Sequence, residues 1–155
     1  YLNSIHKTNF SDNTFDAIYI CGGLHHVLPL LNETILEIHR ILKPGGLFYF
    51  MEPNKDTWVN QIRKLWYRLD DKFADDEEAI SYQNTLKTFL SQGFKEKSIN
   101  FGGNIAYVII LQSLNVGIPQ RYKKYLAPTL FFLERIFSKL PFFPKLFFSA
   151  VWKKN

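Results

Sequence analysis

Of the 155 residues, 46% are hydrophobic and 21% are charged, and the aromatic residues are 15 Phe, 8 Tyr and 3 Trp. This mixture can bury a core, so it excludes a disordered or fibrous chain and favours one compact domain. The net charge of +5 is unevenly distributed: residues 1–97 carry 11 basic and 13 acidic side chains, whereas residues 98–155 carry 8 basic and 1 acidic. Seven of the Phe residues lie between Phe131 and Phe148, so aromatic and positively charged side chains are concentrated in the same final segment.

The single cysteine, Cys21, cannot form an internal disulfide and cannot by itself build a metal site. It fits a reducing, cytoplasmic environment. The longest apolar run, residues 105–111, is far below the roughly 20 residues that cross a bilayer, so we expect no membrane-spanning segment. Because the chain begins with Tyr1 rather than Met, we expect it to be the later part of a longer protein.

The first third of the chain predicts a strand, a helix and a second strand. Residues 15–21 form a nearly continuous apolar run ended by two glycines, which is typical of a central parallel strand buried on both faces. After a loop containing Pro29, Asn32 is the expected N-cap of a helix that ends at the Pro-Gly-Gly sequence of residues 44–46. A second apolar run over residues 47–51 follows, so we predict a βαβ unit.

The rest of the chain alternates helices with two further strands. The expected elements are a helix over 58–73 with one apolar face, an acidic junction over 70–78, a helix over 79–90 closed by Gly93, a strand over 94–101, a buried helix over 105–114, a helix over 121–140 broken around Pro128, and a last strand over 146–152.

Few residues near the first strand carry chemistry. His25 and His26 are adjacent, so on an extended segment their side chains point to opposite sides and cannot both bind one metal ion. We therefore interpret the pair as structural or as lining a substrate site, and we expect no metal site. Cys21 is interpreted as a small packed residue rather than a nucleophile. Glu37 and Arg40, three residues apart on a helix, are interpreted as a solvated ion pair.

Four short motifs follow one another in a defined order: FSDNTFD, LHH, EIHRILKPGG and EP, at residues 10–16, 24–26, 37–46 and 52–53. Together they resemble the second half of class I S-adenosylmethionine-dependent methyltransferases, of the type 11 or ubiquinone/menaquinone-biosynthesis-like group. The clear match covers residues 3–54. The resemblance implies an α/β fold, namely the later strands of a Rossmann-like sheet with an antiparallel last strand and a helical insertion.

The resemblance also implies how this partial methyltransferase domain, residues 1–155, is divided. Residues 1–103 would hold strands four to six with their helices, residues 104–144 a helical insertion or lid, and residues 145–155 the last strand. The glycine-rich loop after the family's first strand and the acidic residue that ends its second strand cannot be found in these residues.

S-adenosylmethionine is the cofactor that the resemblance implies. Ser4 and Ile5 stand where family members carry an Asp-Ala pair near the adenine, a departure from the family pattern. Cys21 and Gly22 stand where the fourth strand meets the methionine end of the cofactor. Gly22 and Gly23 either let the backbone approach a ligand or only form a tight turn, and both alternatives remain open.

Members of this family transfer a methyl group by direct displacement, so the protein mainly provides proximity and desolvation. A base is needed only where the acceptor must lose a proton, and His26 or His25 is the candidate here. The expected acceptor is an unidentified small molecule or a lipid-like compound. The alternative function is non-catalytic: a truncated fragment, or a basic, Phe-rich interaction module at a membrane surface.

The final segment has two interpretations of its own. The favoured one is a lid that buries its Phe residues against the helix over residues 58–73. The other is contact of residues 121–152 with an anionic membrane, because apolar and basic residues alternate as they do in an interfacial helix. A nucleic-acid partner is disfavoured, since the basic residues form no Lys/Arg stripe with a known reading motif.

Overall fold

The computed structural model describes residues 4–69, 78–111 and 117–155. Its centre is a four-stranded sheet in the order β1-β2-β4-β3. The strands are β1 (Phe15–Cys21), β2 (Leu42–Pro53), β3 (Phe94–Gly102) and β4 (Phe147–Lys154). β1 and β2 are parallel, and β4 is antiparallel to both of its neighbours, β2 and β3. The α/β sheet with an antiparallel last strand is therefore confirmed.

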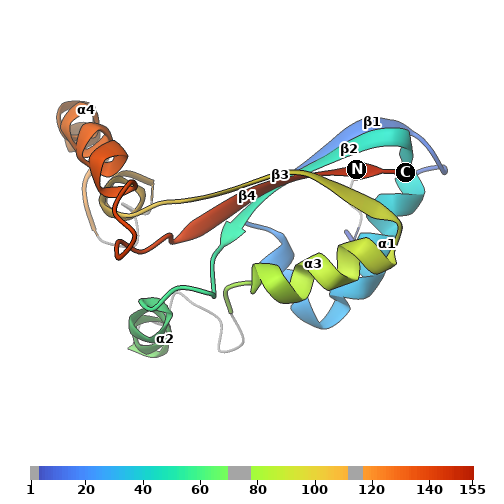
Figure 1. Cartoon of the computed structure of the whole chain (residues 1–155), viewed down its shortest axis with the longest axis horizontal. Helices are drawn as coiled ribbons and strands as arrows, with labels where there is room; N and C mark the ends of the chain where they lie inside the picture. Colours follow the sequence, from blue (N-terminus) through green and yellow to red (C-terminus); the bar gives the residue numbers. More distant parts are fainter. Residues whose placement is uncertain (1–3, 70–77, 112–116) are drawn as a thin grey trace.

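Two helices cover one face of this sheet, and two others lie beyond one of its ends (Figure 1). The covering helices are α1 (Leu31–Ile41) and α3 (Tyr82–Ser91), and the end helices are α2 (Asn60–Leu69) and α4 (Gln120–Phe137). Two short helical turns, η1 (Leu24–Leu30) and η2 (Tyr107–Leu111), complete the described elements. None of the helices described here is long and apolar enough to span a membrane.

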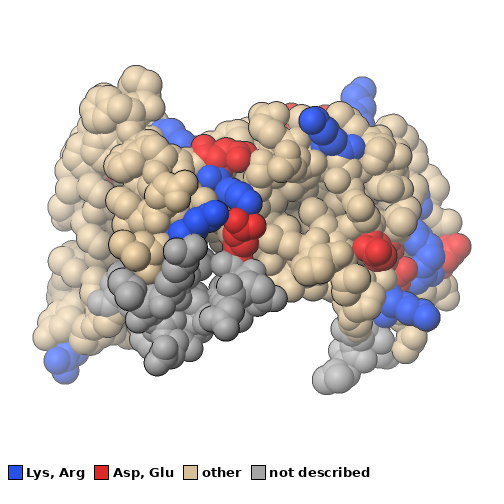
Figure 2. All heavy atoms as spheres, turned by 90° about the horizontal axis from the view of Figure 1, so that it is seen from below, with Lys and Arg blue, Asp and Glu red and all other residues tan. Residues whose placement is uncertain are grey.

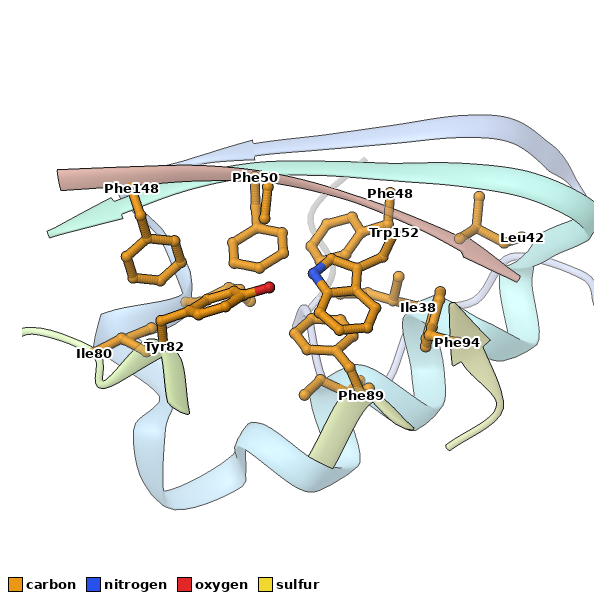
Figure 3. Packing of buried hydrophobic residues seen from close by; sticks show 13 residues of the cluster. Ile38, Leu42, Phe48, Phe50, Ile80, Tyr82, Phe89, Phe94, Phe148 and Trp152 are labelled. Carbon is orange, nitrogen blue, oxygen red and sulfur yellow. The ribbon is translucent and has the colours of Figure 1, made fainter. Parts of the chain in front are cut away.

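Aromatic side chains fill the core between the sheet and its two covering helices. Phe89 of α3 stacks on Trp152 of β4, with 4.9 Å between ring centroids, and on Phe50 of β2 at 5.3 Å. Phe48 and Phe148 close the cluster from β2 and β4 (Figure 3). Full burial of one such side chain contributes roughly 1.5–3 kcal/mol, so this cluster is the main source of stability in the described fold.

The opposite face of the sheet is open among the described residues. Tyr19 of β1 is 68% exposed, and Tyr49 of β2 lies beside it in register. β1 is also an edge strand of the described sheet. The prediction of a central strand buried on both faces is therefore wrong for these residues, because helices cover only one of the two faces.

Helix α1 differs at both ends from the prediction. It begins at Leu31 directly after η1, so Asn32 lies inside the helix and makes no N-cap. It ends at Ile41, before the Pro-Gly-Gly sequence, where the buried Lys154 of β4 donates hydrogen bonds to the carbonyl oxygens of His39 and Leu42, both at 2.7 Å. A cation at a helix C-terminus satisfies its free carbonyls, which a local sequence pattern does not reveal.

The second half of the chain confirms the strands at 94–101 and 146–152 within two residues at each end. Gly93 has the positive φ of 81° expected of a glycine that ends a helix. The predicted break at Pro128 is wrong, since α4 continues through it. In an exposed helix, water can donate a hydrogen bond to the carbonyl oxygen that proline leaves unpaired. Phe73 and most of the acidic junction, and residues 112–114 of the buried helix, lie outside the described residues.

Candidate functional site

The carboxyl ends of three strands meet at one edge of the sheet. β1 and β2 are parallel, and β3 runs in the same direction because both β2 and β3 are antiparallel to β4. Helices α2 and α4 lie beyond this edge (Figure 1). In open α/β sheets, ligands bind outside the carboxyl ends of the strands. We therefore place the candidate site at residues 22–26 and 52–54, where β1 and β2 end.

The centre of this edge is the carboxylate of Glu52, of which only 1% is exposed. Its Oε1 accepts hydrogen bonds from the backbone N–H groups of Gly23 at 2.9 Å and Leu24 at 2.8 Å. Its Oε2 lies 2.7 Å from Nδ1 of His25. A buried carboxylate is costly unless its oxygens are hydrogen-bonded, and these three contacts meet that cost while fixing the loop after β1 to the end of β2.

The two histidines lie together rather than apart. The rings of His25 and His26 are 4.0 Å apart between centroids and tilted by 38°. The prediction that they point to opposite sides is wrong, because residues 24–30 form a helical turn instead of an extended loop. The side chain of His25 is mostly buried against Glu52, whereas His26 is exposed. No group of three possible metal ligands occurs in the part of the chain that the structure describes.

Gly22 and Gly23 are explained by the turn itself. Gly22 has a φ of 59°, which side chains rarely adopt, and its N–H donates to the carbonyl oxygen of Met51 at 2.8 Å. A Cβ on Gly23 would come within 2.8 Å of the Ile20 side chain. Both glycines are therefore required by the path of the chain, so their presence alone does not indicate a ligand.

Cys21 ends β1 with its side chain on the open face of the sheet. Its thiol interacts with the phenol of Tyr19, and this hydrogen bond raises the pKa of Tyr19. Cys21 is exposed, which corrects its interpretation as a packed residue. The thiol of Cys21 therefore lies at the open face of the sheet and not at the loop that carries the two histidines.

Ser4 and Ile5 lie in a turn of their own. The Ser4 hydroxyl is 2.8 Å from Nδ1 of His6, and Ser4 pairs with Lys7 in an isolated bridge. The chain is then fixed to α1, since the backbone N–H of Thr8 donates to Glu37 at 2.8 Å. The described contacts of Ser4 are thus within residues 4–7, and it is Thr8 that connects this turn to α1.

Glu37 and Arg40 form the expected ion pair, but it is only partly solvated: Glu37 is buried, whereas the side chains of Arg40 and its second partner Asp12 are 34% and 70% exposed. Glu37 is 9% exposed and accepts from Arg40 at 2.7 and 2.8 Å and from the Thr8 hydroxyl at 2.5 Å. Arg40 also donates to the carbonyl oxygen of Phe10 at 2.8 Å and to Asp12 at 2.5 Å. The Arg40 guanidinium lowers the pKa of Glu37 to about 2, with further help from Thr8 and against the effect of burial. This network connects residues 8–12 to α1 and is structural.

The sequence motifs included Glu52 but gave it no role. Its partners lie 27 to 29 residues away along the chain, so only the folded sheet brings them together. A weak local signal existed, since an acidic residue directly after a buried apolar run has to find hydrogen-bond donors. Asn54 was missed in the same way: its side-chain amide donates to the carbonyl oxygen of Lys145 at 2.8 Å, connecting β2 to the segment before β4.

Residues 1–50 match the family described as methyltransferase domain. A ubiquinone/menaquinone biosynthesis C-methyltransferase from Bartonella tribocorum is 34% identical over 80 residues, covering 47% of this chain and 30% of that protein. A demethylmenaquinone methyltransferase from Staphylococcus epidermidis is 30% identical over 116 residues, covering 63% of this chain and 48% of that protein. The chain therefore spans less than half the length of these curated relatives.

Solved structures share the fold at low sequence identity. A putative sarcosine dimethylglycine methyltransferase from Galdieria sulphuraria superposes with a TM-score of 0.63 at 13% identity, covering 99% of this chain and 57% of that one. The N-methyltransferase NodS from Bradyrhizobium japonicum, solved with S-adenosylhomocysteine, gives a TM-score of 0.53 at 10% identity, covering 99% of this chain and 52% of that one.

Together these findings confirm the resemblance seen in the motifs. The fold is that of class I S-adenosylmethionine-dependent methyltransferases, and the described sheet is part of it. The first 50 residues match the methyltransferase-domain family, and the two relatives, similar over longer stretches, are named as a C-methyltransferase of ubiquinone/menaquinone biosynthesis and a demethylmenaquinone methyltransferase.

Proposed function

We propose that this chain takes part in S-adenosylmethionine-dependent methyl transfer to a small-molecule, lipid-like acceptor. The observation that supports this most is the loop held by Glu52 at the carboxyl edge of the sheet, where a cofactor and an acceptor would meet. The comparisons favour this function over the non-catalytic alternative, because the relatives that match residues of this chain are named as methyltransferases.

S-adenosylmethionine supplies a methyl group on a positively charged sulfonium. Cys21 and Gly22 are exposed at the carboxyl end of β1, so their backbone is accessible to the methionine end of the cofactor. Ser4 and Ile5 are proposed to lie on the adenine side, where an exposed hydroxyl can donate or accept one hydrogen bond. Because Gly22 and Gly23 have no side chains, a ligand at this edge can come close to their backbone. This fits a contact between the backbone and the methionine end of the cofactor.

His26 is proposed to take the proton that the acceptor loses. Its ring is exposed, and it rests on the ring of His25, which Glu52 holds in place. Histidine is the side chain that exchanges a proton most readily near neutral pH. His25 and Glu52 act here as positioning residues, because they set the place of His26 and need not touch the acceptor.

The proposed acceptor is an apolar compound with an ionisable group. The two relatives described above are named as a ubiquinone/menaquinone biosynthesis C-methyltransferase and a demethylmenaquinone methyltransferase. In this chain, Trp58 just before α2 and Ile62 and Leu65 within α2 each expose more than half of their surface, beyond the carboxyl edge. A lipid-like acceptor is met at a membrane, so peripheral contact with an anionic membrane belongs to the same proposal.

The first experiment measures cofactor binding and transfer separately. Binding of S-adenosylmethionine is measured by calorimetry, both on residues 1–155 and on the full protein that the gene encodes. Methyl transfer from radiolabelled cofactor to a short-chain demethylmenaquinol is then measured. We expect His26→Ala to lower the transfer rate by about 100-fold or more while cofactor affinity stays constant, which is the usual contribution of a general base. The neighbouring Val27→Ala is the matched control.

A proton-transfer role has a further signature. The loss in His26→Ala should shrink as pH rises, because an acceptor that ionises by itself no longer needs the base. Unchanged rates in both His26→Ala and His25→Ala would refute His26 as the base and His25 as the residue that positions it. Failure of the complete protein to bind S-adenosylmethionine would refute methyl transfer as the function.

The second experiment separates the positioning role of Glu52 from its structural role. Glu52→Ala leaves two buried N–H groups unpaired and should destabilise the fold by about 1–3 kcal/mol for each. Glu52→Gln keeps an oxygen acceptor for them, so we expect a folded protein whose transfer rate falls at least about tenfold, a typical effect of an altered positioning contact. Nitrogen-15 NMR should show that the tautomer of His25 is changed in Glu52→Gln. If both the methyl-transfer rate and the tautomer stayed as in the wild type, Glu52 would have no positioning role.

A further inference from the structure

The outer surface of α4 carries positive charge without acidic neighbours on the same helix. Glu134 is the one acidic side chain of residues 98–155. It faces inward, where its Oε2 accepts hydrogen bonds from the backbone N–H groups of Asn104 at 3.3 Å and Tyr107 at 3.0 Å. The exposed cations of the helix, Lys124 and Arg135 among them, therefore have no carboxylate on their own helix to pair with.

Beside these cations runs a strip of exposed apolar side chains. Tyr125, Phe132 and Ile136 are 70%, 64% and 45% exposed. Their spacings of seven and four residues place them on one face of the helix. Lys124 and Arg135, eleven residues apart, follow a parallel line close to them, and the Lys124 ammonium lies 4.8 Å from the Tyr125 ring centroid. We call these five residues the outer face of α4.

The opposite side of α4 fixes the helix to the molecule. Besides the two contacts of Glu134, the side-chain amide of Asn104 donates to the Ser138 hydroxyl at 3.1 Å. After α4, the carbonyl oxygen of Phe142 accepts from the indole N–H of Trp58 at 3.1 Å, and both of these side chains are about two-thirds exposed. The end of α4 is also held by Phe137, which stacks on Phe143 with 4.5 Å between ring centroids, and no residue of α4 is fully buried. The expected lid, which would bury these Phe residues against α2, is not formed by Phe131 or Phe132.

We propose that the outer face of α4 binds the surface of an anionic lipid bilayer, with Tyr125, Phe132 and Ile136 entering the interfacial region and Lys124 and Arg135 facing the lipid headgroups. An aromatic and aliphatic strip flanked by basic residues is the pattern of helices that lie in the membrane interface. Charge complementarity selects the anionic surface, because each basic residue close to it contributes to binding.

The structure narrows the segment that makes this contact. Phe148 and Trp152 are fully buried in the core, so β4 is not part of it, and the earlier expectation of residues 121–152 is restricted to α4 and its flanking turn. Figure 2 shows side chains of both signs in the middle of the molecule and at the end away from α4, whereas the outermost part of the α2 and α4 end shows a basic side chain with no acidic neighbour. A bilayer at this end would also bring a lipid-like acceptor to the carboxyl edge.

The test is co-sedimentation with vesicles, which needs neither cofactor nor methyl acceptor and so remains informative if the proposed methyl transfer fails. The complete protein is mixed with phosphatidylcholine vesicles that contain either no phosphatidylglycerol or about a third of it. We expect binding to the anionic vesicles at low salt, and weaker binding at high salt because exposed charges are screened. Absence of binding to anionic vesicles at low salt would overturn the proposal.

Two double variants test the face itself. One basic residue near an anionic surface is worth roughly fivefold in affinity, so Lys124→Glu with Arg135→Glu should weaken binding at least about 25-fold. Tyr125→Ser with Phe132→Ser should abolish the salt-resistant part of binding. The matched controls are Lys95→Glu with Lys97→Glu on β3 and Leu36→Ser with Leu90→Ser on α1 and α3, all at exposed positions.

Three further outcomes would show that the outer face of α4 does not bind a membrane. An equal loss of binding in the control variants would show that net charge, not this face, binds the vesicles. A dimer seen by analytical ultracentrifugation and dissolved by Phe132→Ser would assign the face to a second copy of the chain. Binding of a short RNA that competes fully with anionic vesicles would assign the basic residues to a nucleic acid.

Discussion

The sheet with its covering helices α1 and α3 and the helix α4 are both rich in aromatic residues, but they differ in whether these residues are buried. In the first region, Phe48, Phe89 and Phe148 are completely buried. In α4, Phe131 and Phe132 are exposed, no residue of the helix is fully buried, and Glu134 and the following Ser138 hydrogen-bond to residues 104–107. The comparison teaches that aromatic content does not locate the core of this chain. What distinguishes the two regions is whether a second layer covers the aromatic face.

The largest expected effect comes from removing one aromatic ring in each region. Phe89 contacts four aromatic rings and has no exposed surface, so Phe89→Ala should lower the free energy of unfolding by about 3–5 kcal/mol. Phe132→Ala should change it by less than about 0.5 kcal/mol. Urea unfolding of both variants measures the difference, and a comparable loss in Phe132→Ala would show that α4 belongs to the core after all.

An effect of intermediate size is expected from acid. The pKa of Glu37 is lowered from 4.5 to about 2 in the folded chain, so the unfolded chain binds the proton more readily. The contribution of Glu37 is therefore complete above about pH 5 and is lost as pH falls from about 4.5 toward 2, with an upper limit of about 3 kcal/mol.

Unfolding by urea at a series of pH values tests this contribution. Glu37→Gln should flatten the profile below pH 5, because the titrating carboxylate is gone. Asp16→Asn is the control, since Asp16 pairs with Lys43 in an exposed ion pair that water screens. If Glu37→Gln left the acid profile unchanged, the stability of the first region would not depend on the ionised carboxylate of Glu37 and its contacts with Arg40 and Thr8.

The sequence could predict those features of the structure that depend on residues close together along the chain, but not those that depend on residues far apart along it. The strands and the turn at Gly93 were predicted from apolar runs, from the weak alternation over residues 94–101 and from a single glycine, which are local features. The roles of Glu52 and Lys154 depend on partners 27 to 29 and 112 to 141 residues away, so no local pattern could show them.

The sequence also could not predict which aromatic residues are buried. Phe132 and Phe148 occur in similar apolar surroundings along the chain, and only the placement of β4 between β2 and β3 buries one of them. In the candidate site, the motif predicted the histidines and the glycine turn. It did not predict that His25 and His26 would stack, because that follows from the helical turn of residues 24–30.

The smallest effect compares the N-termini of α3 and α4. The hydroxyl of Ser81 caps α3 by accepting from the N–H of Asn84 and also donates to Asp56 at 3.0 Å. Helix α4 begins after Pro119 with no side-chain cap. Ser81→Ala should therefore lower the free energy of unfolding by about 1 kcal/mol. Pro119→Ser, which offers α4 a capping hydroxyl, should leave that free energy unchanged, because α4 buries nothing whose loss would unfold the sheet.

Hydrogen exchange distinguishes the two variants further. Pro119→Ser should slow amide exchange within the first turn of α4 alone, whereas Ser81→Ala should speed exchange throughout the cluster around Phe89, since α3 opens only with the core. An increase in global stability from the new cap would mean that the core and α4 unfold together. The outer face of α4 would then be rigidly coupled to the sheet, and binding at that face would stabilise the carboxyl edge directly.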